Sequence, residues 1–296
     1  MYPISMISTK GKRKKSYLPV IWLMTLVGLC LMFSSPALAA VGVNPPVGNP
    51  NDYAGGDWLG TVNDDDYTND GTITGTVYMG DGNDLFTNNS QIDQGMELGD
   101  GEDELINSGD ITGTVTGGSG NDTVTNTGTI GGNIKTEEDD DIVNNSGTVL
   151  NIMTSSGADE VTNGGTVTEG ISTVSGDDYV INNGTAQYIS TGFQEDTIIN
   201  NGTVININGE RHPDVITNNG TVTGDIIGDH GNDTITNNST VNGSIYGSGN
   251  NDTIIVDGRV DNDVDAGTNN DTITLRSGAS VGGVVDGGTW TDGLIF

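Results

Sequence analysis

The sequence predicts an all-β protein, a single-stranded parallel β-helix (solenoid) in which each turn uses 18 or 19 residues. Three observations carry this prediction. An acidic loop returns at a nearly fixed spacing through most of the chain, and three columns of apolar residues keep the same spacing. A column of asparagines also follows it. Self-similarity with a period of this length is typical of solenoids, in which each turn stacks on the one before.

The repeated loop ends in an aspartate, which we call the marker aspartate. The series is Asp66, Asp84, Asp103, Asp122, Asp141, Asp159, Asp178, Asp196, Asp214, Asp233, Asp252 and Asp271, with a weaker copy at Asp292. The gaps are 18 or 19 residues, and only the last is 21. Glycines before the marker, such as Gly118 and Gly120, allow backbone angles that other residues resist. The series predicts about 12 turns, the last of them followed by a partial turn.

Three apolar columns supply the predicted core. They begin at Phe86, Ile73 and Val77, and β-branched residues dominate all three, which favours strands over helices. Three short strands per turn would bury three ladders, and about 12 turns at ~4.8 Å each give a rod about 55–60 Å long. Parallel crossovers are overwhelmingly right-handed, so we expect a right-handed helix. A triangular left-handed helix is the alternative.

A fourth column is polar and lies four residues after the marker. Its members are Asn88, Asn107, Asn126, Asn145, Asn163, Asn182, Asn200, Asn218 and Asn237. Alternation along a strand places this column on the same side as the first apolar column. Stacked asparagines can hydrogen-bond to the turns above and below as a ladder. We therefore predict a structural role, which explains these asparagines better than the glycosylation sequon that many of them also match.

The chain divides into three predicted parts. Residues 1–40 are a secretory signal peptide, because a basic start and an apolar run precede the small residues Ala37 and Ala39. An uncleaved anchor is the alternative. Residues 41–62 are a Pro- and Gly-rich linker or N-terminal cap, in which Trp58 and Tyr53 are candidates to cover the end of the solenoid. Residues 63–296 form the solenoid domain, whose last turn is partial. Trp290 and Phe296 are candidates to cap that end.

Charge and cysteine content exclude several function classes. Signal cleavage would remove the only cysteine and five of the nine cationic residues, which leaves four cations against 41 acids and a net charge of −37. This excludes a nucleic-acid partner, which needs a basic surface. It favours cations as partners and a secreted or cell-surface location. We expect no membrane span after cleavage. We also expect no enzyme activity, because the nearly constant period leaves no room for a cleft.

The marker loops are the candidate binding site. Stacking places the marker aspartates in a column at intervals of ~4.8 Å. Facing like charges are destabilising, by on the order of 1 kcal/mol per contact in water. Carboxylate and loop carbonyl oxygens suit Ca²⁺, so calcium is the expected cofactor and partner. The alternative is a solvated acidic edge that is screened by salt.

Residues 117–125, Gly-Gly-Ser-Gly-Asn-Asp-Thr-Val-Thr, resemble the calcium-binding nonapeptide of the repeats-in-toxin family. Residues 80–84 and 99–103 match this pattern well, and residues 229–233 match in part. Calcium lies between stacked loops in that family, so the resemblance implies sites along one edge. The metal ligands it implies are Asp81, Asp84, Asp100, Asp103, Asp122, Asp141, Asp233, Asp252 and Asp271.

The chain also departs from that family. Each turn has one such loop where the family has two, and the loops at 137–141 and 192–196 have lost most of their glycines. Residues 209–214 introduce a cation. We therefore expect calcium chiefly at the two ends of the series. His212 and His230 are interpreted as surface residues without a special role.

The other half of each turn, such as residues 126–132, resembles repeats of autotransporter passenger domains and large bacterial adhesins. This resemblance implies an adhesin-like solenoid, secreted or on the cell surface, with cell-surface glycans or proteins as further partners. One alternative is an autotransporter passenger without its barrel.

A second alternative is a solenoid that binds to ice or to a polysaccharide surface through a flat face. The candidate face is a threonine column, for which ordinary β propensity is the simpler explanation. It comprises Thr129, Thr148, Thr166, Thr185, Thr203, Thr221 and Thr240.

Overall fold

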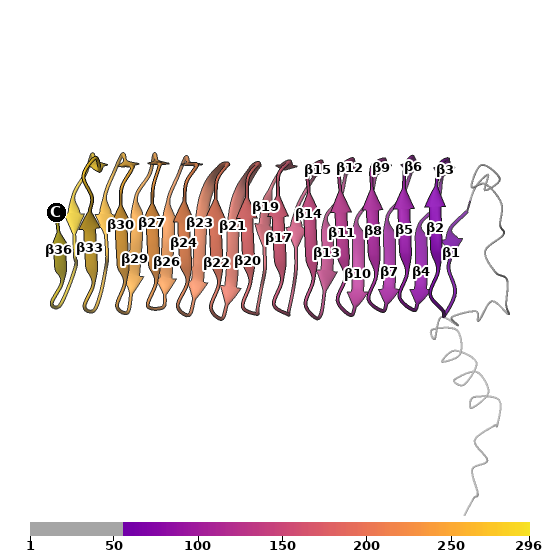
Figure 1. Ribbon diagram of the computed structural model, residues 1–296, viewed down its shortest axis with the longest axis horizontal. Helices are drawn as coiled ribbons and strands as arrows, with labels where there is room; N and C mark the ends of the chain where they lie inside the picture. The colour runs from indigo at the N-terminus through magenta and orange to yellow at the C-terminus, as the bar shows by residue number, and fades with distance from the viewer. Residues whose placement is uncertain (1–55) are drawn as a thin grey trace, which may run out of the picture. The chain divides into compact units, whose positions relative to one another are not determined.

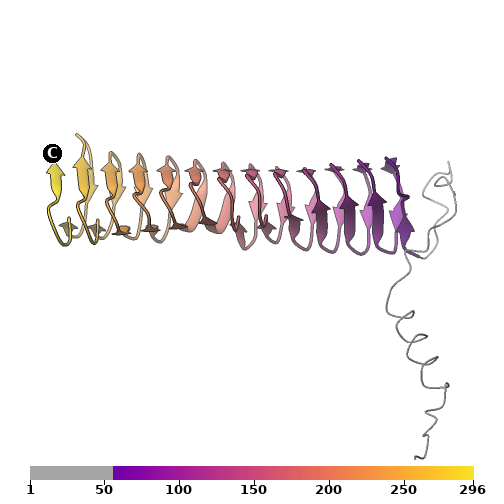
Figure 2. The same ribbon diagram turned by 90° about the horizontal axis from the view of Figure 1, so that it is seen from below.

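The computed structural model describes residues 56–296, in which all helical and strand structure is β-strand (Figures 1 and 2). Successive turns stack along one axis, and their strands pair in parallel with the equivalent strands of the neighbouring turns. This confirms the predicted parallel β-solenoid, while its handedness stays a prediction. The predicted signal peptide and Tyr53 lie outside the described residues. Within these residues, no helix is present that is long and apolar enough to cross a membrane.

One sheet contains the strand that follows each marker aspartate, and we call it the marker sheet. Its 13 strands, one per turn, lie toward the viewer in Figure 1. They are β2 (Asp66–Asn69), β5 (Leu85–Asn88), β8 (Glu104–Asn107), β11 (Thr123–Asn126), β14 (Ile142–Asn145), β17 (Glu160–Asn163), β20 (Tyr179–Asn182), β22 (Thr197–Asn200), β24 (Val215–Asn218), β27 (Thr234–Asn237), β30 (Thr253–Val256), β33 (Thr272–Leu275) and β36 (Gly293–Ile295). Their count agrees with the predicted turns plus a partial one.

The second sheet has 23 strands and contains the other two strands of each turn. The first of these has two residues: β3 (Thr72–Ile73), β6 (Gln91–Ile92), β9 (Asp110–Ile111), β12 (Thr129–Ile130), β15 (Thr148–Val149), β18 (Thr166–Val167), β25 (Thr221–Val222), β28 (Thr240–Val241), β31 (Arg259–Val260) and β34 (Ser280–Val281). The last strand of each turn is β1 (Trp58–Leu59), β4 (Val77–Asp81), β7 (Met96–Asp100), β10 (Val115–Ser119), β13 (Ile134–Glu137), β16 (Ile152–Met153), β19 (Gly170–Ser172), β26 (Ile226–His230), β29 (Ile245–Gly249), β32 (Val264–Asp265) and β35 (Val285–Asp286). In two turns both strands join into β21 (Thr185–Phe193) and β23 (Thr203–Arg211).

The three predicted apolar columns form the core. Their members are buried along the solenoid, except Val281 and Val285 near its end, which are partly buried. The structure adds Ile207 to the third column, where it pairs with Ile189 and Ile226. Trp58 is also buried and packs against Tyr67 in a tilted contact and against Phe86 edge-on, with ring centroids 4.7 and 5.9 Å away. β1, which lies in the segment interpreted as a linker or cap, pairs with β4. Trp58 thus fills the core of the first described turn.

Two predictions at the ends of the solenoid are wrong. Asp66 pairs with Leu85, so Asp65 occupies the marker position of the first turn, and its N–H donates to Asp84 as the later markers do. Three consecutive aspartates precede Tyr67, and only the strand register distinguishes them. Trp290 and Phe296 are 78% and 86% exposed, so neither caps the core.

The asparagine column forms the predicted ladder. Each side chain donates its Nδ2 hydrogen to Oδ1 of the asparagine one turn later, at 2.7–2.8 Å. The ladder begins one turn earlier than predicted, at Asn69, and ends at Asn237 because Val256 takes the next position. All of these side chains are buried. Their amides satisfy one another at the corner where the marker sheet ends.

Candidate metal column and exposed faces

The marker loop connects the last strand of one turn to the marker sheet of the next. Gly118, near the end of β10, and Gly120, in the loop that follows, have φ values of 132° and 108°, in the region that favours glycine. The next loop has lost both glycines, but Glu137 and Asp139 adopt φ values of 79° and 75° there. Both loops therefore follow the same backbone path, and the loop without glycines does so at the cost of some strain. This path turns the marker side chain inward, and Asp122 is only 1% exposed.

The marker aspartates form a second polar ladder, made with the backbone. In each turn, Oδ1 accepts a hydrogen bond of 2.7–3.1 Å from the backbone N–H of the preceding marker. The N–H of Asp103, for example, donates to Asp122. One oxygen of each buried carboxyl is thereby satisfied.

The other oxygen is not. The buried Oδ2 atoms without a hydrogen-bond partner belong to Asp84, Asp103, Asp122, Asp141, Asp159, Asp178, Asp196, Asp214, Asp233, Asp252 and Asp271. A buried, unpartnered carboxylate oxygen is costly, because burial removes water and supplies no replacement. Eleven such atoms in one column mean that the site needs protons or cations.

The pKa values of the marker aspartates also show that burial leaves their charged form without a stabilising partner. Burial is the largest cause that raises the pKa of Asp122 and Asp252 to about 7, and neighbouring markers raise it further. The backbone hydrogen bond to Oδ1 acts in the opposite direction but is outweighed. Burial likewise raises the pKa of Asp214 to about 8 and that of Asp233 to about 6. Without a cation, burial therefore favours the protonated form of these carboxyls.

Seven of the nine predicted ligands lie in this column. Asp81 and Asp100 do not, because they are exposed at the ends of β4 and β7, where Asp100 accepts a hydrogen bond from the Ser119 hydroxyl. The prediction omitted four equally buried markers, namely Asp159, Asp178, Asp196 and Asp214. Their spacing alone identifies them as markers, but the predicted ligand set excludes them because their loops have lost glycines.

The column fits calcium in donor type but not as a carboxylate cage. Its orphaned atoms are hard oxygens, which Ca²⁺ prefers. No three His, Cys, Asp or Glu side chains converge anywhere in residues 56–296. Ca²⁺ takes six to eight oxygen ligands. The marker carboxylates would therefore hold it together with loop carbonyls and water.

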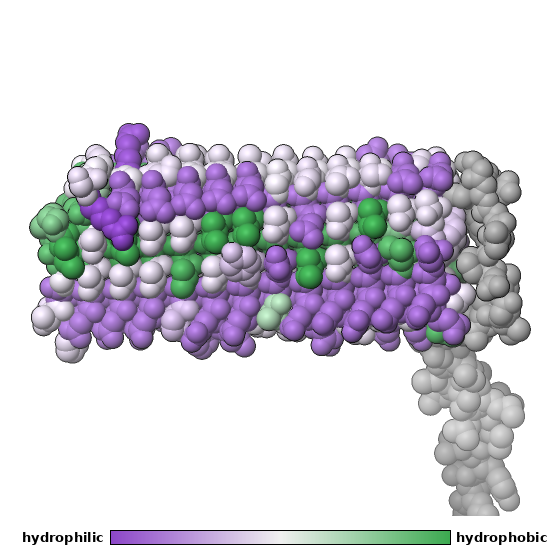
Figure 3. Space-filling view, in the orientation of Figure 1, coloured by the Kyte–Doolittle hydropathy of each residue, from purple (hydrophilic) through white to green (hydrophobic). Residues whose placement is uncertain are grey.

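Figure 3 shows the outer face of the marker sheet, on which hydrophilic and apolar side chains alternate along the solenoid. Residues one and three positions after each marker point outward there, as the alternating burial of β27 shows. Over five turns from β22 to β33 all ten are β-branched, with Thr197, Ile199, Val215, Thr217, Thr234, Thr236, Thr253, Ile255, Thr272 and Thr274 in sequence. We call these ten residues the threonine field. In the earlier turns, Glu104, Glu160 and Tyr179 interrupt the face.

The predicted threonine column lies elsewhere, on the second sheet, mostly on its two-residue strands and at the start of β21 and β23. It is continuous, because Thr129 pairs with Thr148 and Thr221 with Thr240. It forms only one row, however. Two residues further on, the chain carries side chains as different as Leu150, Gln187 and Asn242 in the respective turns.

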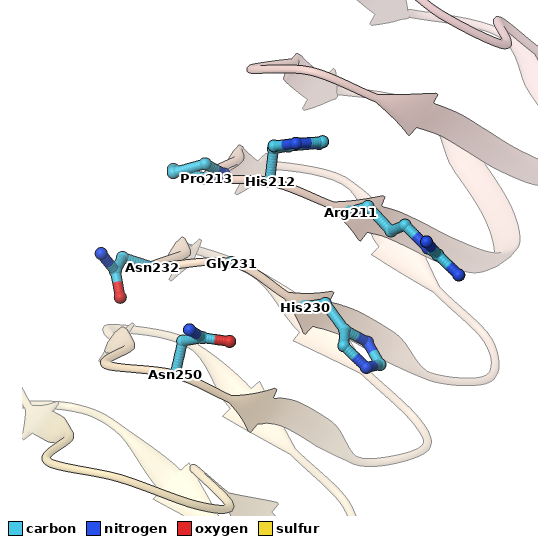
Figure 4. A pocket seen from close by; sticks show the side chains of 7 residues that line it. All are labelled: Arg211, His212, Pro213, His230, Gly231, Asn232 and Asn250. Atoms are coloured by element: carbon cyan, nitrogen blue, oxygen red, sulfur yellow. The ribbon is translucent and has the colours of Figure 1, made fainter.

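A shallow pocket of about 490 Å³ interrupts the acidic loop edge (Figure 4). Arg211 and His230 project to the same side from adjacent strand ends, while His212 projects another way. Arg211 stacks over the ring of Phe193, with 5.3 Å from Cζ to the ring centroid. His230 is 2.6 Å from Asp229, and both histidines are exposed. The pocket thus contains a cationic side chain, Arg211, which also contacts the neighbouring Phe193 ring.

These features define an acidic parallel β-solenoid with a buried aspartate column and a flat threonine-rich face. No protein-family model matches the chain, and no curated protein matches it in sequence. The crystal structure of a hyperactive, Ca²⁺-dependent, β-helical antifreeze protein from an Antarctic bacterium has a similar fold. The TM-score is 0.69 at 21% identity, over 81% of this chain and 83% of the other. This likeness shows the fold, whereas the resemblances to toxin and autotransporter repeats stay predictions.

Proposed function

We propose that the chain is an exported, calcium-stabilised solenoid that binds to ice through the threonine field. The main observation that supports this proposal is that ten outward residues over five consecutive turns are all threonine, isoleucine or valine. Neighbouring strands are ~4.8 Å apart and alternate residues along a strand ~6.7 Å apart, so the side chains form a regular two-dimensional array. β-branched side chains are stiff at χ1, which keeps that array ordered.

The chemistry of the field matches an ordered, uncharged surface. Threonine offers a methyl group and a hydroxyl that both donates and accepts hydrogen bonds. Ice presents a rigid periodic array of the same donors and acceptors. A field without charge is unusual in a chain with 41 acidic residues, and a charged side chain would hold its own water against such a surface. The similar fold of a Ca²⁺-dependent antifreeze protein supports both parts of the proposal.

Calcium has a mechanical role in this proposal. The marker loops lie at one edge of the sheet that presents the threonine field, and the orphaned carboxyl oxygens lie beneath that edge. Bound Ca²⁺ would neutralise them and link neighbouring turns, which stiffens the sheet. The field residues themselves supply the contact with ice. Export would follow from the predicted signal peptide.

The experiment is an ice-recrystallisation assay on the chain without residues 1–40 in the presence of Ca²⁺. Inhibition is expected for the wild type. Thr236→Lys, at the centre of the field, should lose most of it, whereas Thr221→Lys on the second sheet should keep it. Both threonines are partly exposed in regular strands, so the pair is matched. No inhibition by a folded wild type would overturn the ice proposal, and loss with Thr221→Lys alone would move the site to the other face.

An adhesin-like role is a second candidate, and the pocket at Arg211 favours it. The stacked Phe193 ring and Arg211 guanidinium offer an apolar and a cationic contact of the kind that acidic glycans or peptides use. Retention on immobilised acidic polysaccharides, abolished by Arg211→Ala and unaffected by Thr236→Lys, would support this role. A chain with neither retention nor ice activity would contradict both.

A further inference from the structure

The residue five positions before each marker lies against the orphaned carboxyl. It points inward from the last strand of the turn. At Gly117, an added Cβ would lie 2.3 Å from Oδ2 of Asp122, and at Gly228 it would lie 2.4 Å from Oδ2 of Asp233. Gly247 and Asp252 repeat this geometry at 2.5 Å. A side chain at this position therefore lies close to the carboxyl.

We call the residue five positions before each marker the facing position, and its identity divides the column into blocks. Going along the chain, it holds Met79, Leu98 and Gly117, then Thr136, Thr154, Thr173 and Thr191, then Gly209, Gly228, Gly247 and Ala266. The four threonines are consecutive and buried. The other seven positions carry no polar side chain. The division coincides in part with the loops: the loops of the four central turns, with markers from Asp141 to Asp196, depart from the glycine-rich pattern, and so does the loop of Asp214.

The threonine hydroxyls act on the facing carboxyls. Thr136 lowers the pKa of Asp141, and Thr154 that of Asp159, although burial still dominates and raises both. Thr173 and Thr191 act likewise on the next two markers, and no other marker has such a neighbour. The hydroxyls of Thr136 and Thr154 have no hydrogen-bond partner, so they can rotate to donate to a carboxylate or to accept from a carboxylic acid. Those of Thr173 and Thr191 donate to the backbone carbonyls of Thr191 and Gly209 in the next turn, and they can still accept from a carboxylic acid.

The central loops also differ in their backbone. In most loops the residue four positions before the marker has a positive φ, but Ser155 and Val174 do not. The strands that precede these two loops, β16 and β19, are shortened. The acidic residues 137–140 do not add ligands to the marker column, because their side chains are exposed and face water. Two of the four central turns thus have a different loop path, and all four have a threonine hydroxyl near the carboxyl.

We propose that the marker column binds cations in two separate blocks, at Asp84, Asp103 and Asp122 and at Asp233, Asp252 and Asp271. In the four turns between them, buried threonine hydroxyls replace the cation. Asp214 belongs to neither block, because Arg211 in its loop repels a second cation. This proposal rests on the calcium binding proposed above, but not on ice binding. It assigns the centre of the solenoid a stability that does not depend on calcium.

Hydrogen exchange on the wild-type chain, in Ca²⁺ and in excess chelator, tests this division. Chelation should increase exchange in the loops at 80–84, 99–103 and 118–122 and at 229–233, 248–252 and 267–271. Exchange in the four loops between residues 137 and 196 should stay the same. An equal increase in all loops overturns the division while keeping calcium binding. No change in any loop overturns calcium binding itself.

Three variants give an independent answer. Asp103→Asn should lower the number of bound Ca²⁺ ions, measured by equilibrium titration with Ca²⁺ alone, whereas Asp159→Asn should leave it unchanged. Equal losses for the two would overturn the proposal. Thr154→Val keeps the volume and removes the hydroxyl. It should lower the melting temperature equally in Ca²⁺ and in chelator, and a loss confined to Ca²⁺ would assign Thr154 to a metal site instead.

Discussion

Two polar columns run along the solenoid at opposite ends of the same strands, and their buried polar atoms find partners in different ways. β11 follows Asp122 at one end and finishes at Asn126 at the other. The asparagine donates to one neighbour and accepts from the other, so its ladder needs nothing from outside. The aspartate only accepts, and one of its oxygens stays unpartnered. An amide ladder is self-sufficient because it carries both donor and acceptor, whereas a carboxylate ladder needs a proton, a cation or a hydroxyl.

The strongest test of this difference is removal of calcium. Only the aspartate column should respond, and each site occupied at a hundredfold excess over its Kd contributes about 2.7 kcal/mol to stability. With several sites this is the largest expected effect. Thermal unfolding in Ca²⁺ and in chelator measures it. Equal stabilisation by Mg²⁺ or by NaCl would mean general screening and no calcium site.

The asparagine ladder should be expensive to break whether or not calcium is present. Asn200→Ala leaves a buried donor on one neighbour and a buried acceptor on the other, which costs about 2–4 kcal/mol. Asn201→Ala is the matched control, because Asn201 makes the same two amide contacts on the surface. There, water replaces the lost bonds, and the cost should stay below about 1 kcal/mol. Chemical denaturation measures both, and similar costs would contradict the role of burial.

The aspartate column should also make stability depend on pH when chelator is present. Burial raises the pKa of Asp84 and Asp178 to about 7, well above the value of the unfolded chain. The folded state therefore binds more protons between about pH 4 and 7, and its stability falls as the pH rises through this range. Calcium should offset the loss above pH 7, where the carboxylates are ionised. Melting curves at high salt, which screens the exposed acids, isolate the effect. A stability that rises with pH in chelator would contradict it.

The smallest expected effect comes from turning one carboxylate into an amide. Asp252→Asn keeps the Oδ1 that accepts from the N–H of Asp233, but it removes a buried charge. At pH 8 it should stabilise the chain by about 1 kcal/mol in chelator and destabilise it in Ca²⁺. Asp110→Asn, at an exposed position, is the control and should change neither. Loss of stability in both conditions would show that the amide does not fit the site.

Much of the fold could be predicted from the sequence because its determinants are local or strictly periodic. β-branched residues such as Val124 and Ile130 indicate strands, and their spacing of 18 or 19 residues indicates stacking. The asparagine ladder followed from the same spacing. The first marker was misplaced by one residue, because Asp64, Asp65 and Asp66 are equivalent in sequence and only the pairing with β5 distinguishes them.

The site was less predictable from the sequence, because its contacts depend on how side chains face one another in the folded turns. The sequence by itself determined that each turn carries an acidic loop and three strands, since alternation and period suffice for that. Only the tertiary structure decided which carboxyl oxygen is left without a partner, and that Thr154 faces Asp159 across the turn. It also assembled Thr217 and Thr236 into one flat field. Burial, register and the facing of side chains arise only when turns stack, and the chemistry of this protein depends on them.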